Sequence, residues 1–222
     1  MLYKKNRIRF ALTNSHFMVS GTKHLSSAQR EQQIINAADI ILTQVGVQVF
    51  TIDRVIEFLG IAKGTVYKYF DSKDDLLAEV SVKALSMLLN YFRLSQNESV
   101  RGTDRTRAIL SACYSFGQDY PQYIELLFYM ERPEFSTGAT NYITMSEKIT
   151  DFVKRHIELE IENGNLRKNL DPNYTSHVMW GSCMGVMQFL DAKKNFLENV
   201  GTLTQKQLVE TYIDIMVAGM AA

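Results

Sequence analysis

The segment "TIDRVIEFLGIAKGTVYKYFDSKDDLL", Thr51 to Leu77, holds the strongest structural signal in this 222-residue chain. Thr51 is a suitable N-cap for a first short helix, whose apolar positions recur at helical spacing until Gly60 ends it. A second short helix is predicted over 62–70, and Ser72 can cap a longer one. Two short helices joined by a turn that contains glycine are typical of a helix-turn-helix.

The second short helix divides into a buried and an exposed side. Val66 and Phe70 lie one helical turn apart, so they can anchor the helix inward. Gly64 has no side chain, which lets a large partner approach the backbone. The residues predicted to point wholly or partly outward can donate to phosphate oxygens: Lys63, Thr65, Lys68 and Tyr69. This pattern predicts a helix that enters a DNA groove.

The same segment resembles the DNA-binding signature of the TetR family of transcriptional regulators. The matching features are the opening threonine, "GIAKGT", an apolar residue, Tyr, a variable residue, "YF", and "SK" followed by acids and leucines. The match covers roughly Ser27 to Val80 by motif, and beyond that only the general helical layout. The resemblance implies an all-α fold, with an N-terminal three-helix DNA-binding domain and a C-terminal helical domain for ligand binding and dimerisation.

The resemblance also implies which residues contact DNA. They are Thr51, Lys63, Gly64, Thr65, Tyr67, Lys68, Tyr69 and Lys73. Thr51 and Lys73 would contact backbone phosphates at the starts of their helices, and Tyr67 and Tyr69 would clamp phosphates. Lys68 stands at a variable position and is a candidate for base recognition, because lysine can donate to guanine acceptors. The alternatives are a partly buried Tyr67 and a merely solvated Lys73.

Charge restricts where DNA can be contacted. The formal net charge of the chain is zero, and residues 26–80 hold five basic and eight acidic side chains, a net charge of −3. The DNA footprint is therefore expected to be local to the second short helix. Residues 1–25 contain five basic side chains and no acid. They are predicted to be a flexible extension, although Met18 could also begin the protein; the alternative is a basic arm that contacts phosphates.

Three segments are expected: the extension 1–25, the DNA-binding domain 26–72, and the helical effector-binding and dimerisation domain 73–222. The helices expected in the last segment combine apolar periodicity with capping signals: 103–119, one that begins at Pro121, 141–163, one that begins at Pro172, and one that Thr204 caps.

Several classes of protein find no support. The sequence has no HExxH, GxSxG or phosphate-binding glycine motif, so we expect no catalytic residues, no metal and no cofactor. The two cysteines, Cys113 and Cys183, lack metal-ligand spacing and favour a reducing, cytoplasmic location. No apolar run reaches the ~18 residues that a membrane span needs, so no membrane partner is expected.

The resemblance implies a ligand cavity in the C-terminal domain. The candidates are aromatic, methionine and acidic residues: Tyr114, Tyr123, Glu125, Phe128, Tyr142, Met145, Trp180 and Met184. For each of them, ordinary core packing is the alternative. No Arg or Lys occurs between Tyr114 and Met130, which predicts a small apolar or aromatic effector, neutral or cationic, with Glu125 available to a cation.

A homodimer is expected as well, because the family pairs the last two long helices of each subunit in a four-helix interface. The candidates for this interface are Gly181, Gly185, Leu208, Tyr212 and Ile215, with packing inside one subunit as the alternative. These expectations predict a ligand-released homodimeric repressor on a palindromic operator in double-stranded DNA. One alternative is an activator, or a regulator that a protein partner controls. The other is a small helical lipid carrier or enzyme with a vestigial DNA-binding head.

Overall fold

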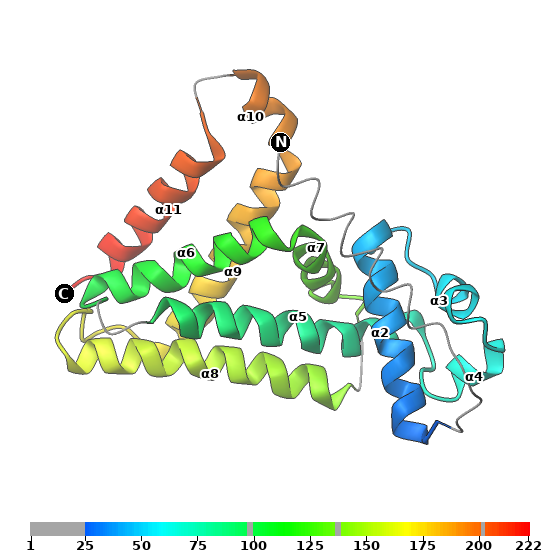
Figure 1. Cartoon of the computed structure of the whole chain (residues 1–222). Helices are drawn as coiled ribbons and strands as arrows, with labels where there is room; N and C mark the ends of the chain where they lie inside the picture. The colour runs from blue at the N-terminus through cyan, green and yellow to red at the C-terminus, as the bar shows by residue number, and fades with distance from the viewer. Residues whose placement is uncertain (1–24, 97–99, 136–138, 201–202) are drawn as a thin grey trace. The chain divides into compact units, whose positions relative to one another are not determined.

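The computed structural model describes residues 25–96, 100–135, 139–200 and 203–222, and within them it contains ten helices and no β-strand (Figure 1). A single isolated bridge joins Leu166 to Ala221 in this part of the chain. The all-α class is therefore confirmed. The chain divides into two compact units between Gln33 and Ile34, inside α2 (Ser27–Val45), and each is described by itself. Residues 1–24, which hold most of the predicted basic extension, lie outside the described residues.

The described part of the first unit begins α2. The Ser26 hydroxyl accepts a hydrogen bond from the Gln29 backbone N–H at 3.3 Å, and the Gln29 side-chain oxygen accepts one from the Ser26 N–H at 2.9 Å. This reciprocal pair satisfies two backbone donors that the helix start leaves open. One turn later, the Arg30 guanidinium donates to the Gln33 side-chain oxygen at 2.7 Å.

The second unit opens with the helix-turn-helix that the sequence predicts. The Thr51 hydroxyl caps α3 (Ile52–Leu59) by accepting from the Arg54 N–H at 3.4 Å, and Gly60 ends it with φ +61°. The next helix, α4 (Lys63–Tyr67), is shorter than the predicted 62–70. After Tyr67 the chain continues as hydrogen-bonded turns, which bring Phe70 into the core ahead of the extended cap residue Ser72.

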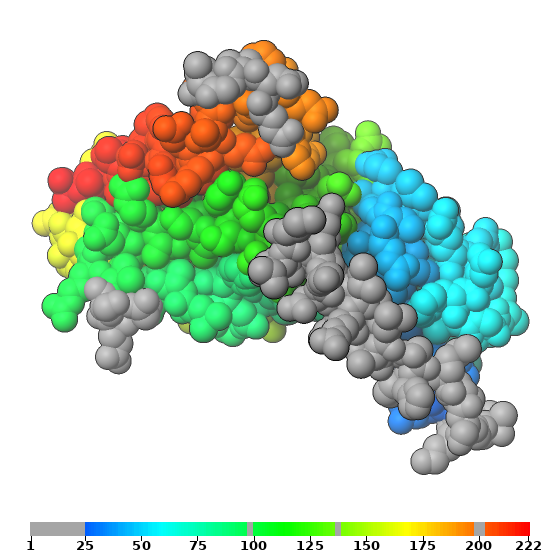
Figure 2. Space-filling view, turned by 45° about the horizontal axis from the view of Figure 1, so that its top comes forward, coloured from blue at the N-terminus to red at the C-terminus, as the bar shows by residue number. Residues whose placement is uncertain are grey.

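The remaining helices form the body of the second unit (Figure 1): α5 (Lys73–Ser95), α6 (Thr103–Asp119), α7 (Pro121–Met130), α8 (Thr140–Glu162), α9 (Pro172–Ala192), α10 (Lys194–Val200) and α11 (Gln205–Met220). Helix α5 packs between α6 and α8, and α8 packs on α9. Helix α11 lies along α6, where the space-filling view shows it in red beside green (Figure 2). Helix α10 has no counterpart among the predicted helices, because Phe196 and Leu197 are its only large apolar residues before Val200.

One apolar core runs through the second unit. Buried residues of α2 and of the helix-turn-helix, among them Ile34, Val55 and Val66, belong to the same cluster as Leu76 and Leu88 of α5. Helix α5 therefore carries the core from the helix-turn-helix into the C-terminal helices. Among the described residues, no helix combines the length and the apolar character that a membrane crossing requires.

Candidate DNA interface and ligand cavities

Helix α4 exposes the side that the sequence predicts. Val66 is fully buried and Phe70 is 4% exposed, so both anchors are in the core. The side chains of Lys63, Tyr67 and Lys68 are exposed, and those of Thr65 and Tyr69 are half-buried. A Cβ on Gly64 would meet no atom within 4 Å. Any limit on the size of residue 64 must therefore come from a partner of the chain and not from its own packing.

The ammonium groups of Lys63 and Lys68 make weak contacts that a phosphate can replace. The Lys63 ammonium lies 3.4 Å from the Asp53 carboxylate and 5.6 Å from the centre of the Tyr67 ring. The Lys68 ammonium lies 5.9 Å from the centre of the Tyr69 ring. The Lys63–Asp53 pair is mostly exposed, with 64% and 75% of the two side chains accessible, so exchanging the carboxylate for a phosphate costs little.

The two predicted phosphate contacts at helix starts differ in their surroundings. Thr51 is exposed, and its hydroxyl oxygen accepts from Arg54 while its own O–H proton stays available for a phosphate oxygen. Lys73, in contrast, donates from its ammonium to the Val47 carbonyl oxygen at 3.0 Å and lies 5.1 Å from the centre of the Tyr129 ring. Burial lowers the pKa of Lys73. Lys73 thus holds the α2–α3 connection onto α5, a role that the sequence did not indicate.

Helix α7 carries two tyrosines that bind acids near the helix-turn-helix. The Tyr123 hydroxyl donates to Asp39 of α2 at 2.6 Å, and Lys83 of α5 pairs with the same carboxylate. The Tyr129 hydroxyl donates to Asp74 at the start of α5, also at 2.6 Å. Burial and the hydrogen bond to Asp39 raise the pKa of Tyr123. A shift of α7 would therefore act on both α2 and α5.

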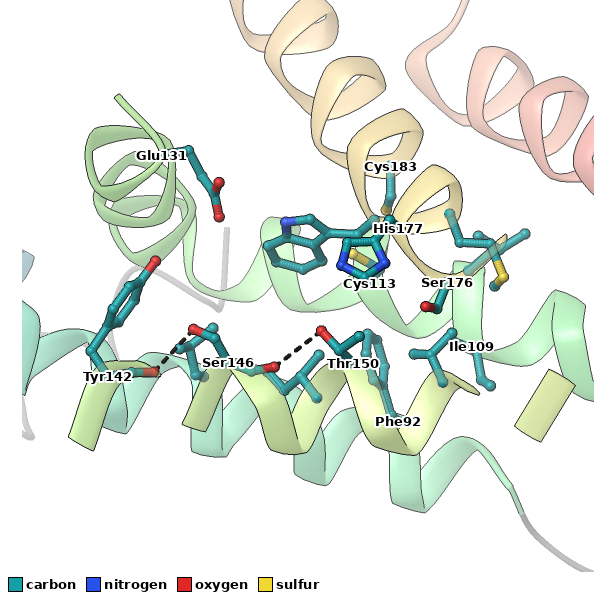
Figure 3. A pocket seen from close by; sticks show the side chains of 16 residues that line it. Phe92, Ile109, Cys113, Glu131, Tyr142, Ser146, Thr150, Ser176, His177 and Cys183 are labelled. Carbon is teal, nitrogen blue, oxygen red and sulfur yellow. Dashed lines mark hydrogen bonds between the residues drawn. The ribbon is translucent and has the colours of Figure 1, made fainter. Parts of the chain in front are cut away.

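A first cavity of about 220 Å³ lies between α5, α6, α8 and α9; we call it the inner cavity (Figure 3). Tyr142 and Trp180 are the predicted ligand residues that line it. Its wall is largely apolar, with Phe92, Ile109 and Val153 among its residues. An apolar cavity of about 150 Å³ is enough to hold benzene, so this volume suits a small apolar molecule.

The polar side chains of the inner cavity include one carboxylate, Glu131, and several hydroxyl groups. Figure 3 shows Ser146 and Thr150 in a row on α8, where their hydroxyls donate to carbonyl oxygens of the same helix at 3.0 and 3.2 Å. Their lone pairs therefore remain open to a donor from a ligand. Cys113 and Cys183 also line the cavity, and the hydrogen bond to Cys183 together with burial raises the pKa of Cys113. Neither thiol forms a disulfide. No local pattern in the sequence predicted that the two cysteines line a cavity.

A second cavity of about 550 Å³, which we call the outer cavity, lies between α6, α7, α9, α10 and the start of α11. Three predicted ligand residues line it: Tyr114, Glu125 and Phe128. The other three predicted ligand residues, Tyr123, Met145 and Met184, are buried and line neither cavity. The predicted set is therefore divided between two cavities and the core.

The predicted dimer residues also fall into two groups. Gly181 and Gly185 lie on an exposed row of α9, which we call the α9 stripe: Tyr174, Val178, Gly181, Gly185 and Phe189. Ile215 of α11 is 66% exposed. Leu208 and Tyr212, in contrast, are partly buried, and the Tyr212 hydroxyl lies 2.8 Å from the Ser182 hydroxyl of the same chain. Both therefore contribute to packing inside one subunit.

The described residues offer few side chains placed for catalysis or for metal binding. No group of three or more His, Cys, Asp or Glu that could hold a metal ion occurs in the ranges given above. His156 is buried beside the Thr106 hydroxyl at 2.9 Å, and burial lowers the pKa of His156 to about 4. His177 lies on the inner cavity, with Nδ1 2.7 Å from the carbonyl oxygen of Asn173.

Comparison with known proteins agrees with this geometry. Residues 34–80 match the family model described as bacterial regulatory proteins, tetR family. The HTH-type transcriptional regulator YhgD of Bacillus subtilis is 27% identical over 155 residues, which are 69% of this chain and 80% of that protein. Among solved structures, the fatty acid degradation regulator FadR from Bacillus halodurans is similar with a TM-score of 0.64 at 16% identity, over 88% of this chain and 97% of that one.

A further solved structure, a transcriptional regulator of the TetR/AcrR family from Thermobifida fusca, has a TM-score of 0.58 at 21% identity and covers 86% of this chain and 97% of its own. The family match falls on the helix-turn-helix, and the structural matches extend over the C-terminal helices. The chain therefore belongs to the TetR family and is a DNA-binding transcriptional regulator.

Proposed function

We propose that the chain is a homodimeric repressor that binds a palindromic operator and leaves it when a small apolar effector binds. The observation that carries this proposal is the division of segment 63–70, α4 and the turn after it, into buried anchors, Val66 and Phe70, and a row of phosphate donors around an open Gly64. A second copy of this helix, about 34 Å away or a little more, would meet the next turn of the same DNA face.

The α9 stripe supports the dimer. Val178 is 59% exposed and Phe189 is 50% exposed, and the two glycines between them would let a second helix approach closely. Such a row of exposed apolar side chains is typical of an interaction surface. Ile215 on α11 would extend the contact to a four-helix interface, and the same strip of the partner would supply the complementary half in a two-fold arrangement.

The inner cavity supports an effector that is small and apolar. Because it lies against α5, which begins directly after the helix-turn-helix, a ligand that prefers a different position of α5 would also move the helix-turn-helix. Helix α7 adds a second connection through Tyr123 and Tyr129. A tenfold loss of operator occupancy needs a ligand preference of about 1.4 kcal/mol for the state that does not bind DNA.

The proposal includes a cytoplasmic location, because a regulator of this kind must reach the DNA. It also includes the absence of enzymatic activity, because regulation of this kind needs only binding. The test is fluorescence anisotropy with DNA from upstream of the protein's own gene, combined with light scattering to determine the mass in solution. Saturable binding by a dimer that small apolar compounds reverse supports the proposal. A monomer, or a dimer that binds this DNA no better than a random duplex, contradicts it.

A further inference from the structure

The outer cavity differs from the inner one in size and in the number of charged groups that line it. At about 550 Å³ it falls within the range that drug-sized ligands occupy in proteins. Its apolar wall includes Tyr114, Phe128 and Met187. Its charged groups are two carboxylates, Glu125 from α7 and Asp191 from α9, and one ammonium group from α10: Lys194.

The two carboxylates of the outer cavity create a negative local field. Partial burial and the charge of Asp191 raise the pKa of Glu125. Within the described residues, Lys194 forms no ion pair with either acid at 4.0 Å or less. An organic cation would therefore reduce the repulsion between Glu125 and Asp191, and the faces of Tyr114 and Phe128 would favour the same charge.

Glu125 also contacts the helix-turn-helix side of the unit. A Cβ on Gly46, where φ is +75° and α2 has just ended, would lie 3.1 Å from Glu125 Oε2. The Val47 backbone lies close enough to the Glu125 carboxylate to oppose the rise in the pKa of Glu125. The carbonyl of the same residue accepts from the Lys73 ammonium at 3.0 Å. The connection between α2 and α3 thus lies beside Glu125 on one side and is bonded by Lys73 on the other.

We infer that the outer cavity is a second ligand site, that it selects a hydrophobic organic cation through Glu125 and Asp191, and that occupation weakens DNA binding because Glu125 turns from Val47 to the ligand. The effect on DNA rests on the proposed function. Cation binding does not, because the residues that select the cation line the cavity and not the DNA-binding surface.

The first experiment measures binding without DNA, by isothermal titration calorimetry. The probes are benzyltriethylammonium as the cation, N,N-diethylbenzamide as a neutral molecule of similar size, and 4-tert-butylbenzoate as the anion. The wild-type protein is expected to bind the cation most tightly. Glu125→Gln keeps the shape and one side-chain oxygen near the Val47 backbone, and it should weaken cation binding roughly tenfold while leaving the neutral probe unchanged.

Glu131→Gln is the matched control, because Glu131 lines the inner cavity and its replacement should leave cation affinity unchanged. If Glu125→Gln does not fold, as judged by thermal denaturation, Asp191→Asn provides the same test from another helix. The inference is overturned if the anion binds as tightly as the cation, if neither Glu125→Gln nor Asp191→Asn weakens cation binding, or if Glu131→Gln weakens it instead.

The second experiment adds DNA from upstream of the protein's own gene. The cation is expected to lower the DNA affinity of the wild-type protein, and Glu125→Gln should bind DNA normally but lose this response. Cation binding that depends on Glu125 but leaves DNA affinity unchanged would overturn the coupling through Val47. A protein that binds no DNA in the absence of the cation would refute the proposed function instead, while calorimetry would still decide whether the cation site exists.

Discussion

The hydroxyl of Tyr123 on α7 donates a 2.6 Å hydrogen bond to the carboxylate of Asp39 on α2, 84 residues away in the sequence. Both side chains are buried, at 4% and 9% exposure, and Lys83 of α5 reaches the same carboxylate. Three helices therefore meet at one charged group. A hydrogen bond to a charge in such surroundings is among the stronger ones in a protein.

Tyr123→Phe tests this junction, because it removes the hydroxyl and keeps the ring. The Asp39 carboxylate would lose one donor and keep Lys83, so the free energy of unfolding should fall by about 1–3 kcal/mol. Urea denaturation measures this change. Tyr91→Phe is the control: Tyr91 makes a bond of the same length to the exposed Asp119, and the loss there should be smaller. Equal losses in the two variants would show that burial does not strengthen the junction.

Tyr67→Phe tests the phosphate contact of α4. Tyr67 is 41% exposed and its ring lies under the Lys63 ammonium, so removal of the hydroxyl should leave the fold unchanged. DNA affinity should fall by about 1–2 kcal/mol, and by the same amount on every sequence, because phosphates carry no sequence information. Anisotropy titrations on several duplexes measure this loss. A loss that varies from duplex to duplex would assign base recognition to Tyr67.

Lys68→Ala should behave differently from Tyr67→Phe. Lys68 is exposed, and its ammonium contacts only the Tyr69 ring among the interactions described above. If its ammonium donates to a guanine, its removal should relax the preference at one base position of each half-site, with a cost of about 1–3 kcal/mol at that position. A binding selection from a randomised operator measures the base preference at each position. An unchanged preference in Lys68→Ala would show that Lys68 does not recognise a base.

Gly64→Ala separates folding from DNA binding. The added Cβ meets no atom within 4 Å, and alanine favours a helix over glycine by up to about 1 kcal/mol, so thermal stability should stay the same or rise. DNA affinity should fall, because the methyl group would stand where the DNA backbone or a base edge has to approach. Gly60→Ala is the contrast: Gly60 has φ +61°, and alanine there should lower stability by about 1 kcal/mol. Undiminished DNA binding by Gly64→Ala would place the DNA elsewhere.

The stability of the fold should depend on pH through His156. Burial, assisted by the charge of Arg105, lowers the pKa of His156 to about 4 from an unfolded value of 6.5. The unfolded state therefore binds more protons between these values, and stability should fall as pH decreases from about 6.5 to about 4, by up to roughly 3 kcal/mol. His156→Gln should flatten this dependence, whereas His177→Gln, at an exposed position, should keep it. Parallel pH profiles for wild type and His156→Gln would contradict this assignment.

The parts of the fold that could be predicted depend on local signals. Thr51, Ser72 and Thr204 were predicted as helix caps, and each accepts a hydrogen bond from a backbone N–H of the first turn. A cap needs only the two or three residues that follow it, so its pattern is complete in the sequence. The end of α4 and the short helix α10 depend instead on where neighbouring helices leave room, and local patterns do not contain that information.

The candidate sites show the same limit. The exposed side of α4 followed from spacing alone, since Val66 and Phe70 fix which side is buried. Lys73, however, binds the carbonyl of Val47, which lies 26 residues away, and this pairing exists only after the helices have packed. Periodicity likewise indicates which side chains turn inward. It does not tell which of them fill space, such as Tyr123, and which border a cavity, such as Tyr142.

Hydroxyl-radical footprinting on DNA from upstream of the protein's own gene tests most directly whether two α4 helices read one operator. We predict two protected patches on one face of the duplex, related by a two-fold axis and centred about one helical turn, or a multiple of it, apart. Both patches should weaken together in Tyr67→Phe. A single patch, or two patches that keep full protection after Tyr67, Lys68 and Lys63 are all replaced by alanine, would contradict this account.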